Sequence, residues 1–342
     1  MHLKQLSDLT GVAGYEHRIR KYIKEKLESK VTKIETDPLG NLICYKKGKK
    51  NNLRVLLAAH MDEVGFIINK INKNGFLGFT PSGGIDPRVL PAKRVLVGNK
   101  EIPGVIHWAP PHLKENSDQS LPKFSSLVID IGASSDKQAK QKVKVGEFAV
   151  FDTKFSRFSK NIIKGKAFDD RVGCSLLMDL LEDKTNYSFE LAVVFSVQEE
   201  VGLRGAAVLG EKIDPKFSLI VEGTAAADFP GEPDQDISTS PRLGGGPVIT
   251  LTDRSTIVDR RLINALVETA KKNKIKYQFK QPNIGGTDAG RIHKSRAGIP
   301  SAILSVPARY IHSPVSLSYL SDYKDTYKLI KLSLVNMLKA IS

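Results

Sequence analysis

A short apolar run that ends on two adjacent carboxylates constrains the fold of this 342-residue chain more than any other stretch. Residues 191–197 are almost entirely apolar and rich in β-branched and aromatic side chains, which is typical of a central strand covered on both faces. Glu199 and Glu200 follow this run. Ligands in open α/β sheets gather at the carboxyl ends of strands, and successive strand residues point to opposite sides. One glutamate can therefore bind a metal while the other faces the reacting water.

Other polar residues occupy similar positions, either after an apolar run or at the start of a helix beside one. They are His60 and Asp62 after residues 53–59, Asp169 before a helix predicted over residues 170–181, Glu222 after residues 217–221, and His312 after residues 299–306. A carboxylate two residues after a histidine can orient its imidazole. An aspartate just before a helix is most often the N-cap, and it is also well placed to bridge two cations.

These positions supply the donor atoms of a dinuclear metal site. The candidate ligands and their neighbours provide two imidazoles and four carboxylates, from His60, Asp169, Glu199, Glu200, Glu222 and His312. Zinc, cobalt and manganese are suited to such a mixed set. A bridging carboxylate lets two cations lie about 3.5–4 Å apart and share a hydroxide at neutral pH. A remaining carboxylate can take the proton of that water and pass it to a leaving amine.

The pattern changes between residues 66 and 160, where short alternating strands are broken by Gly and Pro and helical periodicity is absent. This stretch predicts a small all-β domain inserted into an α/β domain. The expected division is therefore a main domain made of residues 1–65 and 161–342, and an insert made of residues 66–160.

Composition excludes several classes of protein. No apolar run approaches 18 residues, so we expect no membrane span. Cys44 and Cys174 lie in apolar contexts without metal-ligand spacing, as expected for reduced cysteines of a cytoplasmic protein. The net charge is +15, but the lysines are scattered singly or in pairs. This favours a solvated surface, or a preference for anionic substrates, over nucleic-acid binding.

Six motifs carry a resemblance to a known family. They are His60-Met-Asp-Glu-Val-Gly-Phe, Gly83-Gly-Ile-Asp-Pro-Arg, Ala167-Phe-Asp-Asp-Arg-Val-Gly, Val197-Gln-Glu-Glu-Val-Gly, Gly285-Gly-Thr-Asp-Ala-Gly and Arg309-Tyr-Ile-His-Ser-Pro. In this order they resemble the dinuclear-metal aminopeptidases of the TET type, the glutamyl and deblocking aminopeptidases, some of which carry the old label cellulase M. The resemblance implies an α/β fold, with a zinc-peptidase-like mixed sheet flanked by helices and a barrel-like insert that mediates assembly. It also implies self-association into dimers or a tetrahedral dodecamer whose active sites face an inner chamber.

The resemblance also implies a role for each residue. His60 and Glu222 would be the terminal ligands of one metal, Glu200 and His312 those of the other, and Asp169 the bridge between them. Glu199 would be the general base and Asp62 the partner of His60. Aspartate is usual in the family at the position of Glu222, and Asp228 is the second choice of ligand there. Asp288 could help to shape the substrate pocket.

The expected activity is removal of N-terminal residues from short peptides by a hydroxide shared between two metals, with a glutamate as base. The basic composition makes acidic N-terminal residues a plausible preference. The alternatives are a related metal-dependent amidohydrolase or glycosidase, and, in a different class, a non-catalytic basic protein that binds nucleic acid or acts as a scaffold. Glycosidases normally use two carboxylates that bind no metal, whereas most of the carboxylates here are assigned to metal.

Overall fold

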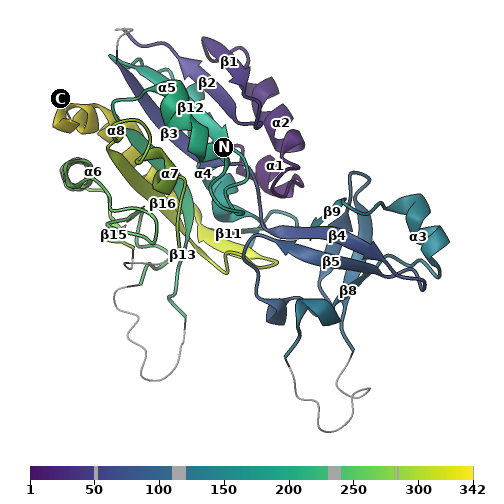
Figure 1. The fold of residues 1–342 in the computed structure, drawn as a ribbon. Helices are drawn as coiled ribbons and strands as arrows, with labels where there is room; N and C mark the ends of the chain where they lie inside the picture. The colour runs from purple at the N-terminus through teal and green to yellow at the C-terminus, as the bar shows by residue number, and fades with distance from the viewer. Residues whose placement is uncertain (50–52, 110–120, 230–239, 281, 283–284, 342) are drawn as a thin grey trace.

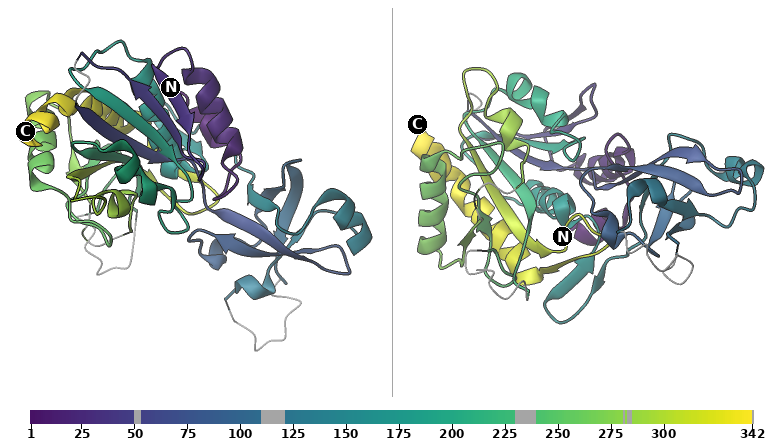
Figure 2. Two further views of the ribbon diagram at one scale, coloured as in Figure 1. Left: turned by 45° about the horizontal axis from the view of Figure 1, so that its top comes forward. Right: turned by 60° about the horizontal axis from the view of Figure 1, so that its bottom comes forward.

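The computed structural model describes residues 1–49, 53–109, 121–229, 240–280, 282 and 285–341. An α/β part and a smaller β-barrel lie side by side (Figures 1 and 2). Among the described residues, no helix is long and apolar enough to cross a membrane.

The α/β part is built on a mixed sheet of 11 strands. Nine of them form a continuous path in the order β1 (Lys33–Thr36), β2 (Leu42–Lys46), β12 (Glu190–Ser196), β3 (Arg54–His60), β13 (Ser218–Ala225), β16 (Ser301–Arg309), β17 (Ser316–Tyr319), β11 (Ile162–Gly165) and β10 (Ser156–Arg157). Strand β14 (Val248–Ile249) pairs with β16 and with β15 (Gln278–Phe279). The central strands β12, β3, β13 and β16 are parallel, so their carboxyl ends lie at one edge of the sheet.

Helices cover the sheet, as Figures 1 and 2 show. Their bounds are α1 (Leu3–Asp8), α2 (His17–Leu27), α4 (Phe168–Glu182), α5 (Leu209–Ile213), α6 (Arg260–Lys272), α7 (Ala289–Ile292) and α8 (Leu320–Ile341). Helix α4 packs on β3 and β13 and contacts α1, α2 and α8, while α8 also contacts α6. One large cluster of buried apolar side chains joins the sheet to these helices. Burial on both faces explains the continuous apolar runs within β3, β12 and β13.

The smaller part is a closed barrel with a core of its own. Its strands are β4 (Gly65–Ile71), β5 (Leu77–Ser82), β6 (Arg94–Val97), β7 (Ile102–His107), β8 (Val128–Asp130) and β9 (Phe148–Phe151), and α3 (Asp136–Lys142) lies outside it. The predicted fold class, a mixed sheet flanked by helices with a barrel-like insert, is therefore confirmed. Strand β10 falls inside the predicted insert of residues 66–160 but pairs in the large sheet. The domain division itself stays a prediction.

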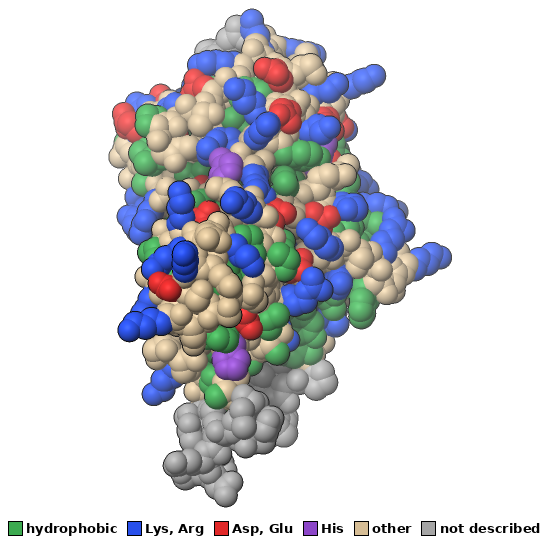
Figure 3. All heavy atoms as spheres, turned by 90° about the vertical axis from the view of Figure 1, so that its right-hand side faces the viewer, with side chains coloured by type: hydrophobic (Ala, Val, Ile, Leu, Met, Phe, Trp, Pro, Cys, Tyr) green, Lys and Arg blue, Asp and Glu red, His purple; other side chains and the backbone are tan. Residues whose placement is uncertain are grey.

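The basic side chains do not form a single block on the face that carries the barrel. Figure 3 shows Lys and Arg spread over this face, with acidic and apolar side chains between them. Such mixed surfaces are typical of solvated proteins.

Candidate active site

The parallel strands bring the predicted site residues to one edge of the sheet. His60 is the last residue of β3 and lies opposite Ser196, the last residue of β12. Glu199 and Glu200 follow β12 directly, and Glu222 lies within β13 on the other side of β3. The sequence pattern found these residues because each one ends or closely follows an apolar run, although β13 itself continues through Glu222 to Ala225.

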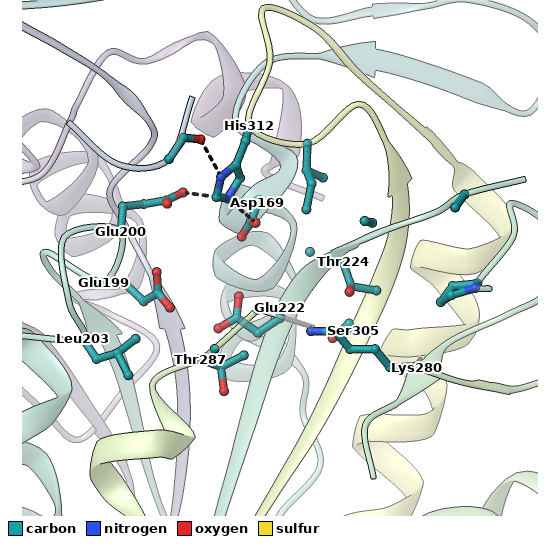
Figure 4. A pocket seen from close by; sticks show the side chains of 18 of the residues that line it. Asp169, Glu199, Glu200, Leu203, Glu222, Thr224, Lys280, Thr287, Ser305 and His312 are labelled. Carbon is teal, nitrogen blue, oxygen red and sulfur yellow. Dashed lines mark hydrogen bonds and ion pairs between the residues drawn. The ribbon is translucent and has the colours of Figure 1, made fainter. Parts of the chain in front are cut away.

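The side chains form two groups that share Asp169, and Figure 4 labels their members except His60. In the first group, Nε2 of His60 lies 3.1 Å from Asp169 Oδ1 and 3.6 Å from Glu222 Oε2. In the second, Nε2 of His312 lies 3.3 Å from Asp169 Oδ2 and 3.5 Å from Glu200 Oε1. Within each group the potential ligand atoms lie within 4.8 Å of one another. Glu199 belongs to neither group, although its Oε2 is 4.0 Å from Nε2 of His60.

Asp170, not Asp169, caps the regular part of helix α4, which begins after the non-helical backbone of these two residues. Oδ1 of Asp170 accepts a hydrogen bond from the backbone N–H of Gly173 at 2.9 Å, and Oδ2 accepts one from the N–H of His60 at 3.2 Å. This is the N-cap pattern, which uses a side-chain oxygen for an otherwise unpaired helix N–H. Asp169 is thereby free to face both histidines. The N-cap role that the sequence suggested for Asp169 belongs to Asp170 instead.

Asp62 acts mainly on the two glutamates. Its carboxylate accepts hydrogen bonds from the backbone N–H groups of Glu199 at 3.0 Å and Glu200 at 3.1 Å. Nδ1 of His60 lies 3.1 Å from the backbone carbonyl oxygen of Asp62 and 3.5 Å from its carboxylate. Sequence reasoning paired Asp62 with His60 alone. It missed the contact with the glutamates, because that contact depends on the neighbouring positions of β3 and β12.

The electrostatics show an excess of buried negative charge. Burial raises the pKa of Glu199 well above its ordinary value, and repulsion from Asp288 and Glu200 adds to this, although His60 opposes it. Burial also raises the pKa of Glu200 to about 7 and that of Glu222 well above its usual range. A bound divalent cation would favour the ionised form of each of these carboxyl groups.

Unpartnered oxygens in both groups fit a metal. Among the described residues, Oε1 of Glu200 and Oε1 of Glu222 are buried and have no hydrogen-bond partner. Buried carboxylate oxygens are normally hydrogen-bonded or bound to metal. Glu222 reaches His60 and Asp169 despite its extra methylene, so its side chain is compatible with the proposed ligand position. Asp228 instead pairs with Arg309, at 2.6 Å and 2.9 Å.

A buried ion cluster, formed by Glu63, Lys166 and Arg171, joins the segments that carry the first ligand group. Nζ of Lys166 donates to both carboxylate oxygens of Glu63 at 2.7 Å, and Nη2 of Arg171 donates to the same carboxylate at 3.3 Å. Nε of Arg171 also donates to the carbonyl oxygen of Met61 at 2.8 Å. Sequence reasoning did not identify this cluster. All three side chains are at most 2% exposed.

A cavity of about 550 Å³ opens beside the two groups and is lined by Glu199, Glu200 and His312, among others. Lys280 lines the same cavity, and its Nζ is 3.7 Å from where a Cβ on Gly285 would lie. Asp288 is fully buried, accepts a hydrogen bond from the Ser196 hydroxyl and does not line the cavity. The residues just before it, Gly285, Gly286 and Thr287, do so. Asp288 can therefore act on the substrate only indirectly, through these residues or through its repulsion of Glu199.

Comparison with known proteins identifies the family. The family model of the M42 glutamyl aminopeptidases matches residues 40–329. The chain belongs to the M42 aminopeptidase family. The lysyl aminopeptidase of Pyrococcus furiosus is 33% identical over 96% of this chain and 94% of its own length. The predicted resemblance is thus confirmed, and the family is one of hydrolases that act on peptides.

Solved structures of this M42 chain's relatives share its fold. A TET aminopeptidase from Thaumarchaeota archaeon SCGC AB-539-E09 has a TM-score of 0.93 and 34% identity, over 99% of this chain and 98% of the other. The Pyrococcus horikoshii TET1 peptidase can assemble into a tetrahedron or a large octahedral shell. It has a TM-score of 0.85 and 36% identity, over 96% of this chain and 97% of its own. A Thermotoga maritima protein described as an endoglucanase has a TM-score of 0.84 and 39% identity, over the whole of both chains.

Proposed function

We propose that this M42 family member is a dinuclear metal aminopeptidase that removes N-terminal residues from short peptides. The observation that carries the proposal is the pair of ligand groups that share Asp169, next to a glutamate that belongs to neither group. His60, Glu222 and Asp169 would hold one divalent cation, and Glu200, His312 and Asp169 the other. Zinc and cobalt suit this set best, and manganese is compatible with it.

Two cations bound there would polarise the scissile carbonyl and lower the pKa of the attacking water. Glu199 is the proposed general base, which takes a proton from that water and delivers it to the leaving amine. Its raised pKa is consistent with carrying a proton between these two steps. Asp62 accepts hydrogen bonds from the backbone N–H groups of Glu199 and Glu200 and so fixes the proposed base and a proposed ligand relative to each other.

We also propose that Lys280 favours peptides with an acidic N-terminal residue. It places a cation on the wall of the cavity beside the ligand groups. An acidic side chain would gain a charge-assisted contact there, whereas a basic one would be repelled. The family description names glutamyl aminopeptidases, and the lysyl enzyme of Pyrococcus furiosus shows that the preference varies among relatives.

The test is a panel of aminoacyl-anilides, assayed after chelation and reloading with zinc, cobalt or manganese. We expect activity only with metal, and a higher kcat/KM for the glutamyl than for the leucyl substrate. Lys280→Met should reverse that ratio, while Lys276→Met, at an exposed lysine that does not line the cavity, should preserve it. Metal-independent hydrolysis would refute the proposed function, and an unchanged ratio in Lys280→Met would refute the role of Lys280.

The endoglucanase description of the Thermotoga maritima relative does not change this proposal. Glycosidases normally use two carboxyl groups that are free of metal, whereas among the described residues that line the cavity only Glu199 has a carboxyl group outside both ligand groups. We therefore expect cello-oligosaccharides to remain intact under conditions in which the anilides are cleaved. The charge pattern likewise leads us to expect no nucleic-acid partner.

We further propose that copies of this chain self-associate in the cytoplasm, as dimers or as a tetrahedral shell. The assemblies of the Pyrococcus horikoshii TET1 peptidase support self-association, and the free, buried Cys44 and Cys174 fit a reducing compartment. Light scattering at micromolar concentration should give a mass well above 37.6 kDa. A monomeric mass would contradict the assembly but not the chemistry.

A further inference from the structure

We propose that the turn Gly83-Gly84, which belongs to the inserted barrel, is a positioning element of the second ligand group. It follows β5 (Leu77–Ser82) and reaches back to the α/β part, where Gly84 lines the active-site cavity. The inference rests on the proposed metal centre and adds a function for the barrel beyond assembly: its turn fixes the directions in which His312 and Glu200 point.

The first observation is a hydrogen bond between distant parts of the chain. Nδ1 of His312 lies 2.8 Å from the carbonyl oxygen of Gly84, and Figure 4 shows this contact at the top of the site. A carbonyl can only accept, so Nδ1 must carry the hydrogen, and in the neutral imidazole that can bind a metal Nε2 presents its lone pair. That lone pair faces Asp169 and Glu200, at 3.3 Å and 3.5 Å. Such a bond fixes both the tautomer and the ring orientation of a metal-binding histidine.

His312 depends on this bond more than His60 depends on its own. The side chain of His312 is 38% exposed, whereas that of His60 is 1% exposed and enclosed by packing. Among the described residues, the Gly84 carbonyl is the partner found for Nδ1 of His312. Without it, the ring could rotate towards solvent.

The second observation concerns Gly83, whose backbone lies against the other terminal ligand of the same group. A Cβ on Gly83 would lie 2.9 Å from Val64 Cγ1, 3.2 Å from Glu200 Cβ and 3.3 Å from Glu200 Oε2. The residue also has a φ of +86°, which favours glycine. Glycine therefore allows the turn to approach Glu200 this closely, and any side chain there would push the turn and the ligand apart.

Asp86 follows the turn two residues later and makes local bonds to Arg88. Its Oδ1 accepts a hydrogen bond from the backbone N–H of Arg88 at 2.9 Å, and its carboxylate pairs with the Arg88 guanidinium. It thereby caps the short helix η1 (Pro87–Val89). The motif Gly83-Gly-Ile-Asp-Pro-Arg then has a physical explanation, with two residues for close approach to the metal centre and a capped helical turn that anchors them.

The test compares Gly83→Ala with Gly146→Ala. Gly146 also belongs to the barrel and has a φ of +94°, but no atom lies within 4 Å of the position of its Cβ, so it controls for backbone strain alone. Metal content is measured by elemental analysis after dialysis against graded concentrations of chelator. We expect Gly83→Ala to lose one of two metals at about 10–100-fold lower chelator concentration than Gly146→Ala does, and to lose the other metal only at a higher concentration.

Asp86→Ala is a second test variant, and because Asp86 is exposed the substitution should not disturb folding. We expect it, too, to lose one metal at a lower chelator concentration than Gly146→Ala does. The inference is overturned if Gly83→Ala and Asp86→Ala release their metals at the same chelator concentrations as Gly146→Ala. It is also overturned if each of the two variants loses both of its metals at one chelator concentration. Should Gly83→Ala fail to fold, Asp86→Ala decides alone by the same criterion. A wild-type protein that binds fewer than two metals would instead refute the proposed function, so the two failures are distinguishable.

Discussion

Replacing Glu63 with glutamine should destabilise this protein by an amount that grows as the pH falls. Glu63 is the only acidic member of its buried ion cluster, and both oxygens accept hydrogen bonds from Lys166. Glutamine keeps the shape of the side chain but removes the charge and turns an N–H donor towards the ammonium group. Lys166 and Arg171 are then left as two buried cations with no anion between them.

The magnitude follows from the pKa of Lys166. Burial lowers this pKa from 10.5 to about 8, even though the charge of Glu63 opposes the shift. In the unfolded chain the Lys166 ammonium group keeps its proton up to about pH 10.4. Between pH 8 and this value the unfolded state therefore binds more protons than the folded state, so the free energy of unfolding rises with pH. Without Glu63 the folded pKa falls further, and this range extends below pH 8. The extra cost then has an upper limit of about 1 kcal/mol at pH 7 and about 3 kcal/mol at pH 6, because these values lie one and two pH units below the wild-type pKa of about 8.

Lost hydrogen bonds add about 1–3 kcal/mol at every pH. The assay is urea unfolding of wild type and Glu63→Gln at pH 6, 7, 8 and 9, with chelator present so that metal binding does not contribute. Glu25→Gln, which breaks an exposed pair with Lys21, should cost about 0.5 kcal/mol or less at each pH. A difference between wild type and Glu63→Gln that is constant in pH, or largest at pH 9, would refute the reasoning.

Two further predictions concern the metal centre itself. Glu199→Gln should retain both metals and lose about 10²–10⁴-fold in kcat, because only proton transfer is removed; wild-type hydrolysis of aminoacyl-anilides would show that Glu199 is not the base. His312→Ala should reduce the metal content from two ions to one, since one ligand group loses its imidazole while the His60 group stays whole; two ions found by elemental analysis would contradict the assignment.

Most of the proposed ligand positions could be anticipated from the sequence because they end or follow apolar runs that form buried parallel strands. His60, Glu199 and Glu200 are next to one another in space for the same reason that β3 and β12 are apolar: both strands lie in the middle of the sheet. Asp169 could be proposed but not separated from its neighbour, because the choice of cap depends on which carboxylate reaches the N–H of Gly173.

Other contacts could not be derived from local pattern. The bond from His312 to Gly84 joins residues 228 positions apart and depends on how the barrel packs against the α/β part. Lys166 and Arg171 read as ordinary charged residues near a helix start, and their burial appears only once Glu63 is placed between them. Lys280 ends an alternating stretch, residues 274–280, in which it looks like one more polar residue of a half-exposed strand, so only the cavity reveals its position.

The single carboxylate that belongs to both ligand groups has a thermodynamic consequence. Because Asp169 is common to the two proposed sites, the occupancy of one changes the orientation and charge of a donor in the other. Linkage requires this influence to be reciprocal: whatever factor the first ion imposes on the affinity for the second, the second imposes on the first. A metal titration of this enzyme should therefore be analysed with a coupling constant, and not as the sum of two independent isotherms.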